Sequence, residues 1–169
     1  MKFSNGCWLQ KEGCECFAPQ QVYFVEKEKK RVVICAPTAR IRHRGDTLGG
    51  INLTLEITSP MPEVLRVRTR HHKGMKRNGP EFELNAGEPV DMDVREDEET
   101  IRISSGTLTL VLTKENWSMT YERNGEILSK SSGRDLAYMK TYWKGYAYDK
   151  GSQDAYMRQQ LGLSVGELV

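Results

Sequence analysis

Hydrophobic and polar residues alternate with a period of two along most of this chain. The segment 51–58, INLTLEIT, places Ile51, Leu53, Leu55 and Ile57 on one side and polar residues on the other. Successive side chains of a β-strand point to opposite faces, so this pattern predicts a half-buried strand. The same pattern predicts further strands within the segments 63–72, 89–94, 99–105 and 106–115.

Three short segments between these strands have the composition of turns. The dipeptide Asn124-Gly125 lies inside WSMTYERNGEIL and supplies the two positive-φ residues of a type I′ hairpin turn. Ser105-Gly106 separates two of the alternating segments. The segment QVYFVEKEKKRVVICA is predicted to form two strands joined by a charged turn around residues 26–30.

Short strands separated by turns every 8–12 residues are typical of an antiparallel β-sandwich. No segment shows apolar residues at the spacing of a capped helix, so little helix is expected. No repeat, low-complexity tract or linker divides the sequence, which predicts a single all-β domain over 1–169. Between residues 129 and 153 the alternation is lost, and a long, partly irregular connection is predicted there.

The last eleven residues, QQLGLSVGELV, alternate again and are predicted to form a half-buried strand that runs to the final residue. Most chain ends are polar and fray, whereas this one is apolar. The expectation is therefore a sandwich whose strands continue in a longer protein. An exposed strand edge at 161–169 would favour self-association by strand pairing.

Composition excludes several classes of function. The 25 Lys and Arg against 23 Asp and Glu leave a net charge of +2, too balanced to indicate a nucleic-acid partner. No apolar run approaches the roughly 18 residues of a membrane span, so no membrane partner is expected. The start of the chain lacks the apolar region of a secretory signal, which favours a cytoplasmic location.

Metal and cofactor chemistry is not predicted. Cys14 and Cys16 flank one residue and share a face if the segment is extended, but zinc sites generally use two pairs at wider spacing. The adjacent His71 and His72 would point to opposite faces of a strand. Free thiols, no metal and no cofactor are expected.

Two charged segments and one aromatic segment are candidates for binding. RVRTRHHKGMKR, residues 66–77, holds six Lys or Arg, and EPVDMDVREDEE, residues 88–99, supplies seven acids that could neutralise it. Rings with a polar edge can stack on sugars or pack at an interface with a neighbouring domain, and packing is favoured here because the rings lack regular spacing. The candidate aromatic residues are Tyr138, Tyr142, Trp143, Tyr146 and Tyr148, followed by Tyr156.

Several sequence words occur in an order that resembles the start of bacterial α-xylosidases of glycoside hydrolase family 31. They include MKFSNGCWLQKEG, QVYFVE, VVICAP, ITSPMPEVLRVRTRHHKG and RNGPEFELN, followed by GTLTLVLTKENWSMTYERNGEIL and YMRQQLGLSVGE. The resemblance covers essentially residues 1–169. It implies an N-terminal β-sandwich of galactose-mutarotase-like form, here an incomplete supersandwich, within a large α-xylosidase or α-glucosidase.

In that family the two catalytic aspartates belong to a (β/α)₈ barrel. The enzymes retain the configuration at the anomeric carbon, which requires the two carboxyl groups to lie about 5–5.5 Å apart. No alternation of strands and helices typical of a barrel occurs in these 169 residues, so no catalytic residue transfers to any position here. The resemblance implies a hydrolase as the parent, with α-xylosides or α-glucosides as substrates, a barrel as partner, and no activity in this chain alone. The alternatives are a stand-alone carbohydrate-binding module and a protein-interaction module.

Overall fold

A computed structural model describes residues 13–48, 50–71, 88–142 and 153–160. Within them, the chain forms twelve strands and one 3₁₀ helix. The elements are β1 (Cys14–Phe17), β2 (Phe24–Lys27), β3 (Val32–Pro37), η1 (Arg44–Leu48), β4 (Asn52–Thr58), β5 (Arg66–Arg70), β6 (Asp93–Glu96), β7 (Thr100–Ser105), β8 (Leu108–Thr113), β9 (Ser118–Arg123), β10 (Glu126–Ser132), β11 (Leu136–Tyr142) and β12 (Gln153–Gln159).

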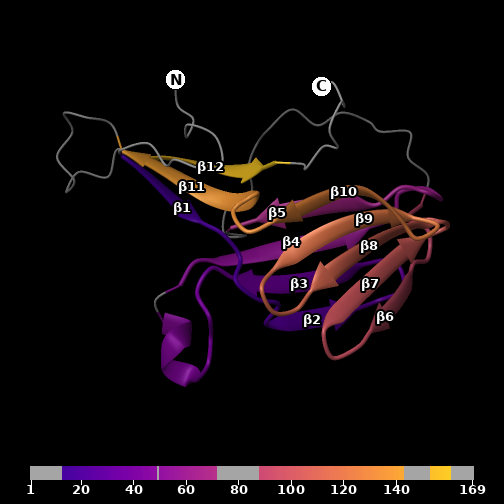
Figure 1. Cartoon of the computed structure of the whole chain (residues 1–169), viewed down its shortest axis with the longest axis horizontal. Coiled ribbons are helices and arrows are strands. Elements are labelled where there is room, and N and C mark those ends of the chain that lie inside the picture. The colour runs from indigo at the N-terminus through magenta and orange to yellow at the C-terminus, as the bar shows by residue number, and fades with distance from the viewer. Residues whose placement is uncertain (1–12, 49, 72–87, 143–152, 161–169) are drawn as a thin grey trace.

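The strands form three antiparallel sheets. One sheet has the order β2-β3-β4-β5, the second has the order β10-β9-β8-β7-β6, and the third has the order β1-β11-β12. Figure 1 shows the small third sheet lying beside the two larger ones, with η1 projecting from the connection between β3 and β4. The predicted all-β antiparallel sandwich with little helix is confirmed.

The core lies between the two larger sheets and follows from the alternation in sequence. On β4, Leu53, Leu55 and Ile57 are fully buried, while the intervening residues are exposed or half-buried. The second sheet contributes fully buried side chains from β7 and β8 to the same cluster: Ile101, Ile103, Leu110 and Leu112. Apolar burial at about 25 cal/mol per Å² holds the two sheets together.

Both predicted glycine turns are confirmed by the backbone. Asn124 and Gly125 have φ values of 50° and 83°, as a type I′ turn between β9 and β10 requires. Gly106 has a φ of 60° in the turn between β7 and β8. The predicted pair of strands around residues 26–30 is also present, since β2 and β3 pair through Lys27 and Val32.

The prediction of an irregular connection from residue 129 to residue 153 is wrong over 129–132 and 136–142. β10 continues to Ser132, and β11 occupies Leu136–Tyr142 between β1 and β12. Leu136, Ala137 and Met139 are all buried, so apolar residues lie on both faces of β11. A strand covered on both faces loses the apolar–polar alternation by which the other strands were predicted.

The predicted strand at the end of the chain, 161–169, lies outside the described residues, and so does its strand edge. No helix in the part of the chain that the structure describes has the length and apolar character to cross a membrane.

Candidate functional site

Of the six candidate aromatic residues, the structure places two side chains, those of Tyr138 on β11 and Tyr156 on β12. Tyr156 packs against the small cluster of Ala18, Ala137 and Met139. The ring of Tyr138 lies 4.2 Å from the ring of His71 and 6.4 Å from that of Phe17, measured between centroids. Tyr138 also packs against the main core. The side chain of Tyr142 and all of Trp143, Tyr146 and Tyr148 lie outside the described residues. Tyr138 is thus engaged within the domain, and the sugar-contact role of the group stays a prediction.

Cys14 and Cys16 lie on one face of β1, as predicted for an extended segment. Both pack against Ala137 and Met139 of β11, and Arg158 Nη2 donates to Cys16 Sγ at 3.8 Å. Over residues 13–48, 50–71, 88–142 and 153–160, no three His, Cys, Asp or Glu side chains are grouped so that they could hold a metal ion. The face of β1 that carries Cys14 and Cys16 is therefore part of a small hydrophobic cluster.

One arginine of the basic strand β5 forms an ion pair with the neighbouring strand β4. Arg68 Nη1 lies 3.8 Å from Glu56 Oε1 on β4, and Arg31 Nε lies 3.6 Å from the other oxygen of Glu56. For the described part of the basic segment, the expected pairing with residues 88–99 is wrong. The acids of that segment pair elsewhere, Glu88 with Lys30 and Glu96 with Lys27 and Lys114.

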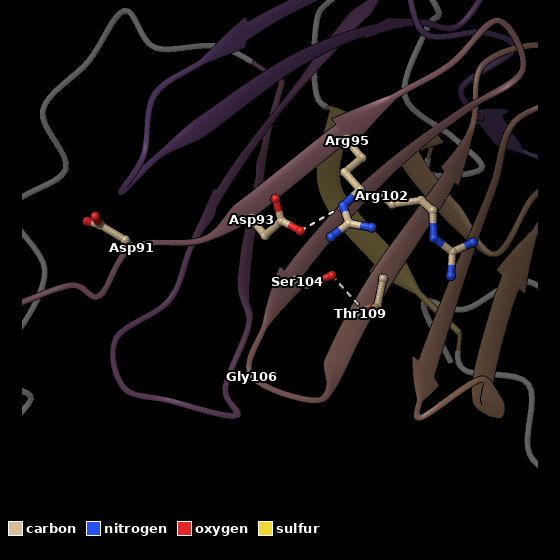
Figure 2. Close-up of a pocket in the computed structure, with 7 residues that line it drawn as sticks. All are labelled: Asp91, Asp93, Arg95, Arg102, Ser104, Gly106 and Thr109. Atoms are coloured by element: carbon tan, nitrogen blue, oxygen red, sulfur yellow. Dashed lines mark hydrogen bonds and ion pairs between the residues drawn. The ribbon is translucent and has the colours of Figure 1, made fainter.

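A polar groove of about 460 Å³ lies over β6, β7 and β8 on the outer face of the five-stranded sheet (Figure 2). Arg95 Nε donates to Asp93 Oδ2 at 2.8 Å, and the hydroxyls of Ser104 and Thr109 lie 2.8 Å apart. Arg102 also lines the groove and donates to Glu122 at 2.6 Å. The groove therefore presents hydroxyls and paired charges, a surface suited to polar contacts.

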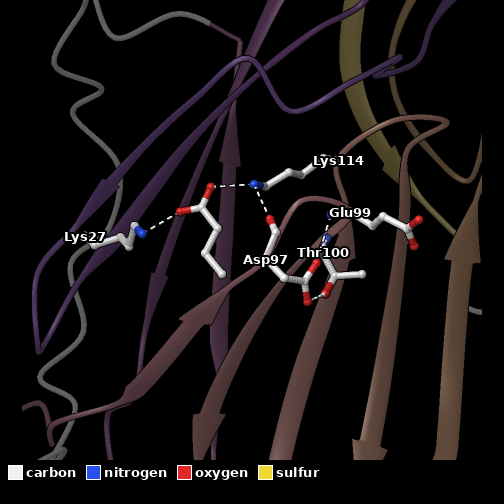
Figure 3. A network of polar contacts seen from close by, with 6 residues as sticks. Lys27, Asp97, Glu99, Thr100 and Lys114 are labelled. Carbon is white, nitrogen blue, oxygen red and sulfur yellow. Dashed lines mark hydrogen bonds and ion pairs between the residues drawn. The ribbon is translucent and has the colours of Figure 1, made fainter.

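One edge of the sandwich is closed by ion pairs between the two larger sheets (Figure 3). The carboxylate of Glu96 lies against Lys27 of β2 and 2.7 Å from Lys114 Nζ. Lys114 Nζ also donates to the carbonyl oxygen of Asp97 at 2.5 Å. The Asp97 carboxylate accepts from the backbone N–H groups of Glu99 and Thr100 at 2.8 and 2.7 Å and stabilises the β6–β7 turn.

These contacts lower the pKa values of three carboxyl groups. Hydrogen bonds from Lys114 and then Lys27 lower the pKa of Glu96 below 4.5, against a smaller opposing effect of burial. Hydrogen bonds from Thr100 lower the pKa of Asp97, and hydrogen bonds from Thr107 lower that of Glu63. A glycosidase acid needs the opposite shift, because it must stay protonated near neutral pH.

Stability is expected to fall in acid because of these shifts. A carboxyl group whose pKa is lower in the folded state stabilises the fold fully above its unfolded pKa, here about 4.5 for Glu96. That stabilisation is lost as the pH falls through the lower folded pKa. Urea unfolding of Glu96→Gln, followed from pH 7 to pH 3, should show a shallower loss of stability than the unchanged chain.

Glu98→Gln is the matched control, since Glu98 is exposed and lies two residues away. It should keep the pH dependence of the unchanged chain. If Glu96→Gln and Glu98→Gln give the same slope, the Lys27–Glu96–Lys114 contacts do not contribute to stability in this way.

A second groove, which the sequence reasoning missed, has a mainly apolar lining. We call it the aromatic groove, a hollow of about 370 Å³ over the β2–β3–β4 sheet and the β3–β4 connection. Its lining includes Tyr23, Phe24, Pro37, Ala39 and Ile41. The available signal in the sequence was the adjacent aromatic pair Tyr23-Phe24, where β2 begins.

Comparison with known proteins identifies the class of domain and its family. Residues 54–169 match the model of the glycosyl hydrolase 31 N-terminal galactose mutarotase-like domain. Two solved structures from Listeria monocytogenes share the fold at a TM-score of 0.54 and 13% identity: the uncharacterised protein lmo2446 and the cycloalternan-forming enzyme in complex with a pentasaccharide substrate. In each case the match covers 80% of this chain and 12% of the other. The fold is thus that of a galactose mutarotase-like sandwich.

The chain belongs to the glycoside hydrolase 31 N-terminal domain family. It is 29% identical to the α-xylosidase XylQ of Lactiplantibacillus pentosus over 170 residues, which cover all of this chain and 21% of that protein. It is 32% identical to an α-xylosidase of Emericella nidulans over 110 residues, which cover 65% of this chain and 14% of that protein. The chain therefore spans about a fifth or less of the length of these curated relatives.

Proposed function

We propose that this chain is the non-catalytic N-terminal domain of an α-xylosidase-like retaining glycoside hydrolase, and that it supports a catalytic (β/α)₈ barrel. Its family and its two α-xylosidase relatives support this proposal. The matched segments make up only 21% and 14% of the two relatives, which leaves room for a separate catalytic part. Because both relatives are named α-xylosidases, α-xylosides are favoured over α-glucosides as substrates of the longer enzyme to which this domain would belong.

The observation that carries the non-catalytic role is the small share of the α-xylosidase relatives that this chain matches, 21% and 14%. The carboxyl groups agree with it. A retaining mechanism needs one ionised nucleophile and, about 5–5.5 Å away, a second carboxyl group whose pKa is raised. Every pKa shift found for a described Asp or Glu is a lowering, at Glu63, Glu96 and Asp97. In the polar groove, the Asp93 carboxylate accepts a hydrogen bond from Arg95 Nε.

The isolated chain is accordingly expected not to hydrolyse glycosides. The purified 169-residue protein, incubated with 4-nitrophenyl α-D-xylopyranoside and the corresponding α-glucoside, should release 4-nitrophenol no faster than buffer. Turnover at an enzyme-like rate of about 1 s⁻¹ or more would contradict the proposal.

A supporting role is tested by a domain exchange. In the hybrid enzyme, the 170 matched residues of the Lactiplantibacillus pentosus α-xylosidase are replaced by this chain. The hybrid is expected to be soluble and to hydrolyse the α-xyloside, because the two segments share a family and a fold. An inactive hybrid that is nevertheless folded would show that this chain cannot support that barrel.

A further inference from the structure

The aromatic groove has two half-exposed aromatic side chains in a mainly apolar lining. Phe24, the first residue of β2, and Tyr23, which precedes it, are 56% and 55% exposed. Leu48, at the end of η1 and next to the groove residue Thr47, is 90% exposed. Exposed aromatic side chains that line an apolar groove are typical of interaction sites.

The wall of the groove is a braced loop. The β3–β4 connection is closed at its base, where Thr38 donates to Ile51 O through both N–H and Oγ1 at 2.9 Å. Within the loop, Asp46 Oδ2 accepts from the backbone N–H groups of Arg42 and His43 at 2.9 and 3.3 Å. Long connections that are ordered by their own hydrogen bonds are commonly functional. In this connection the hydrogen bonds fix the backbone that carries Ala39, Ile41 and Thr47.

Two arginines lie between the groove residues Ile41 and Asp46 in the sequence of the β3–β4 connection. The connection places Arg42 and Arg44 on the surface, exposed, and within the described residues neither guanidinium has a hydrogen-bond or ion-pair partner. The single acid of the groove lining is Asp46, which is engaged with the loop backbone and with His43 Nε2 at 3.4 Å. A complementary surface would be apolar at its centre and carry carboxylates at its border.

We infer that the aromatic groove is the docking surface for the remaining part of the parent glycosidase, which presents an apolar patch bordered by Asp or Glu. This inference rests on the proposed function. Two observations select this occupant. About four-fifths of the Lactiplantibacillus pentosus relative lies outside the matched segment, and a surface of that part could cover the half-exposed Tyr23 and Phe24. Docking places Tyr23 and Phe24 in the interface core and Arg42 and Arg44 at its rim.

The test compares two pairs of substitutions in the hybrid enzyme and in the isolated chain. Tyr23→Ser with Phe24→Ser removes the apolar floor, and Arg42→Glu with Arg44→Glu reverses the rim charge without touching the core. Ile127→Ser with Leu128→Ser is the matched control, since these residues are 61% and 41% exposed on β10 of the other sheet. Urea midpoints, kcat/KM and amide hydrogen exchange are measured for each protein.

Both groove variants should lower kcat/KM of the hybrid by about tenfold or more, because a displaced support misplaces the active site. They should leave the urea midpoint of the isolated chain nearly unchanged, and the control should leave both measurements unchanged. In the unsubstituted hybrid, amide exchange across residues 38–48 should be at least about tenfold slower than in the isolated chain.

An active hybrid in which residues 38–48 exchange as fast as in the isolated chain overturns this inference and leaves the proposed function standing. An active hybrid impaired by the β10 control and not by the groove variants also overturns it, since docking then uses the other sheet. A folded hybrid without activity counts against the proposed function, and the docking inference falls with it.

Discussion

Replacing Leu55 with alanine is expected to lower the free energy of unfolding by about 3 kcal/mol, within the range measured for buried leucines. Leu55 is fully buried at the centre of β4 and belongs to the main core cluster. Its truncation removes apolar contacts with both larger sheets and leaves a cavity that the paired strands can close only in part. Urea unfolding followed by tryptophan fluorescence measures the change.

The control is the same substitution at an exposed leucine, Leu48→Ala. Leu48 is 90% exposed, so its replacement in the isolated chain should change stability by no more than about 0.5 kcal/mol. A domain of this kind has a total stability of about 5–15 kcal/mol, so the two variants should be easy to distinguish. Equal effects would contradict the assignment of the core to the space between the two larger sheets.

Gly106→Ala is expected to be more destabilising than Gly125→Ala, although both glycines lie in hairpin turns at positive φ, 60° and 83°. Each alanine would pay the left-handed backbone penalty of about 1 kcal/mol. At Gly125 a new Cβ meets nothing within 4 Å. At Gly106 it would overlap Oε1 of Glu63, which accepts a hydrogen bond from Thr107 N at 2.7 Å, while Oε2 accepts from Thr107 Oγ1 at 2.5 Å.

The extra loss at Gly106 comes from the contact between the two sheets. The Glu63 side chain must rotate away and release Thr107, next to the buried contact between Ser59 Oγ and Ser105 Oγ at 2.7 Å. Unfolding midpoints in urea for the two alanine variants and for Glu63→Gln separate the backbone and side-chain effects. Equal losses for Gly106→Ala and Gly125→Ala would show that Glu63 does not link the β4–β5 and β7–β8 connections in solution.

The sequence predicted the strands that have one face in the core and the other in water. On β4 the alternation from Leu53 to Ile57 appears directly in the burial of the residues. The turn at Asn124-Gly125 was predictable because its backbone angles favour these two residue types. In these places local chemistry and tertiary structure point to the same conformation.

β11 is the central strand of its sheet, between β1 and β12. It could not be predicted from alternation, because both of its faces carry buried apolar residues. Its apolar residues Leu136, Ala137 and Met139 are consecutive or nearly so, and such a pattern has no preferred face. The order of the sheets depends on pairings between distant segments, such as Cys14 with Thr141. Such pairings are decided by the folded structure as a whole and leave little trace in local sequence.

The candidate site was harder to predict than the fold. Tyr138 was selected for its aromatic ring, and in the structure this ring lies near the rings of His71 and Phe17. The aromatic groove was missed because its lining is assembled from β2, β3, the β3–β4 connection and β4. Only the pairing of these strands brings Tyr23, Pro37 and Ile41 around one hollow.

The domain exchange tests most directly the claim that this chain supports the catalytic part of an α-xylosidase-like enzyme. The measurement is kcat/KM for 4-nitrophenyl α-D-xylopyranoside, compared between the hybrid enzyme and the same Lactiplantibacillus pentosus enzyme with its 170 matched residues deleted. The account predicts that the hybrid retains activity and exceeds the deletion variant by about 100-fold or more. A deletion variant as active as the hybrid would contradict it.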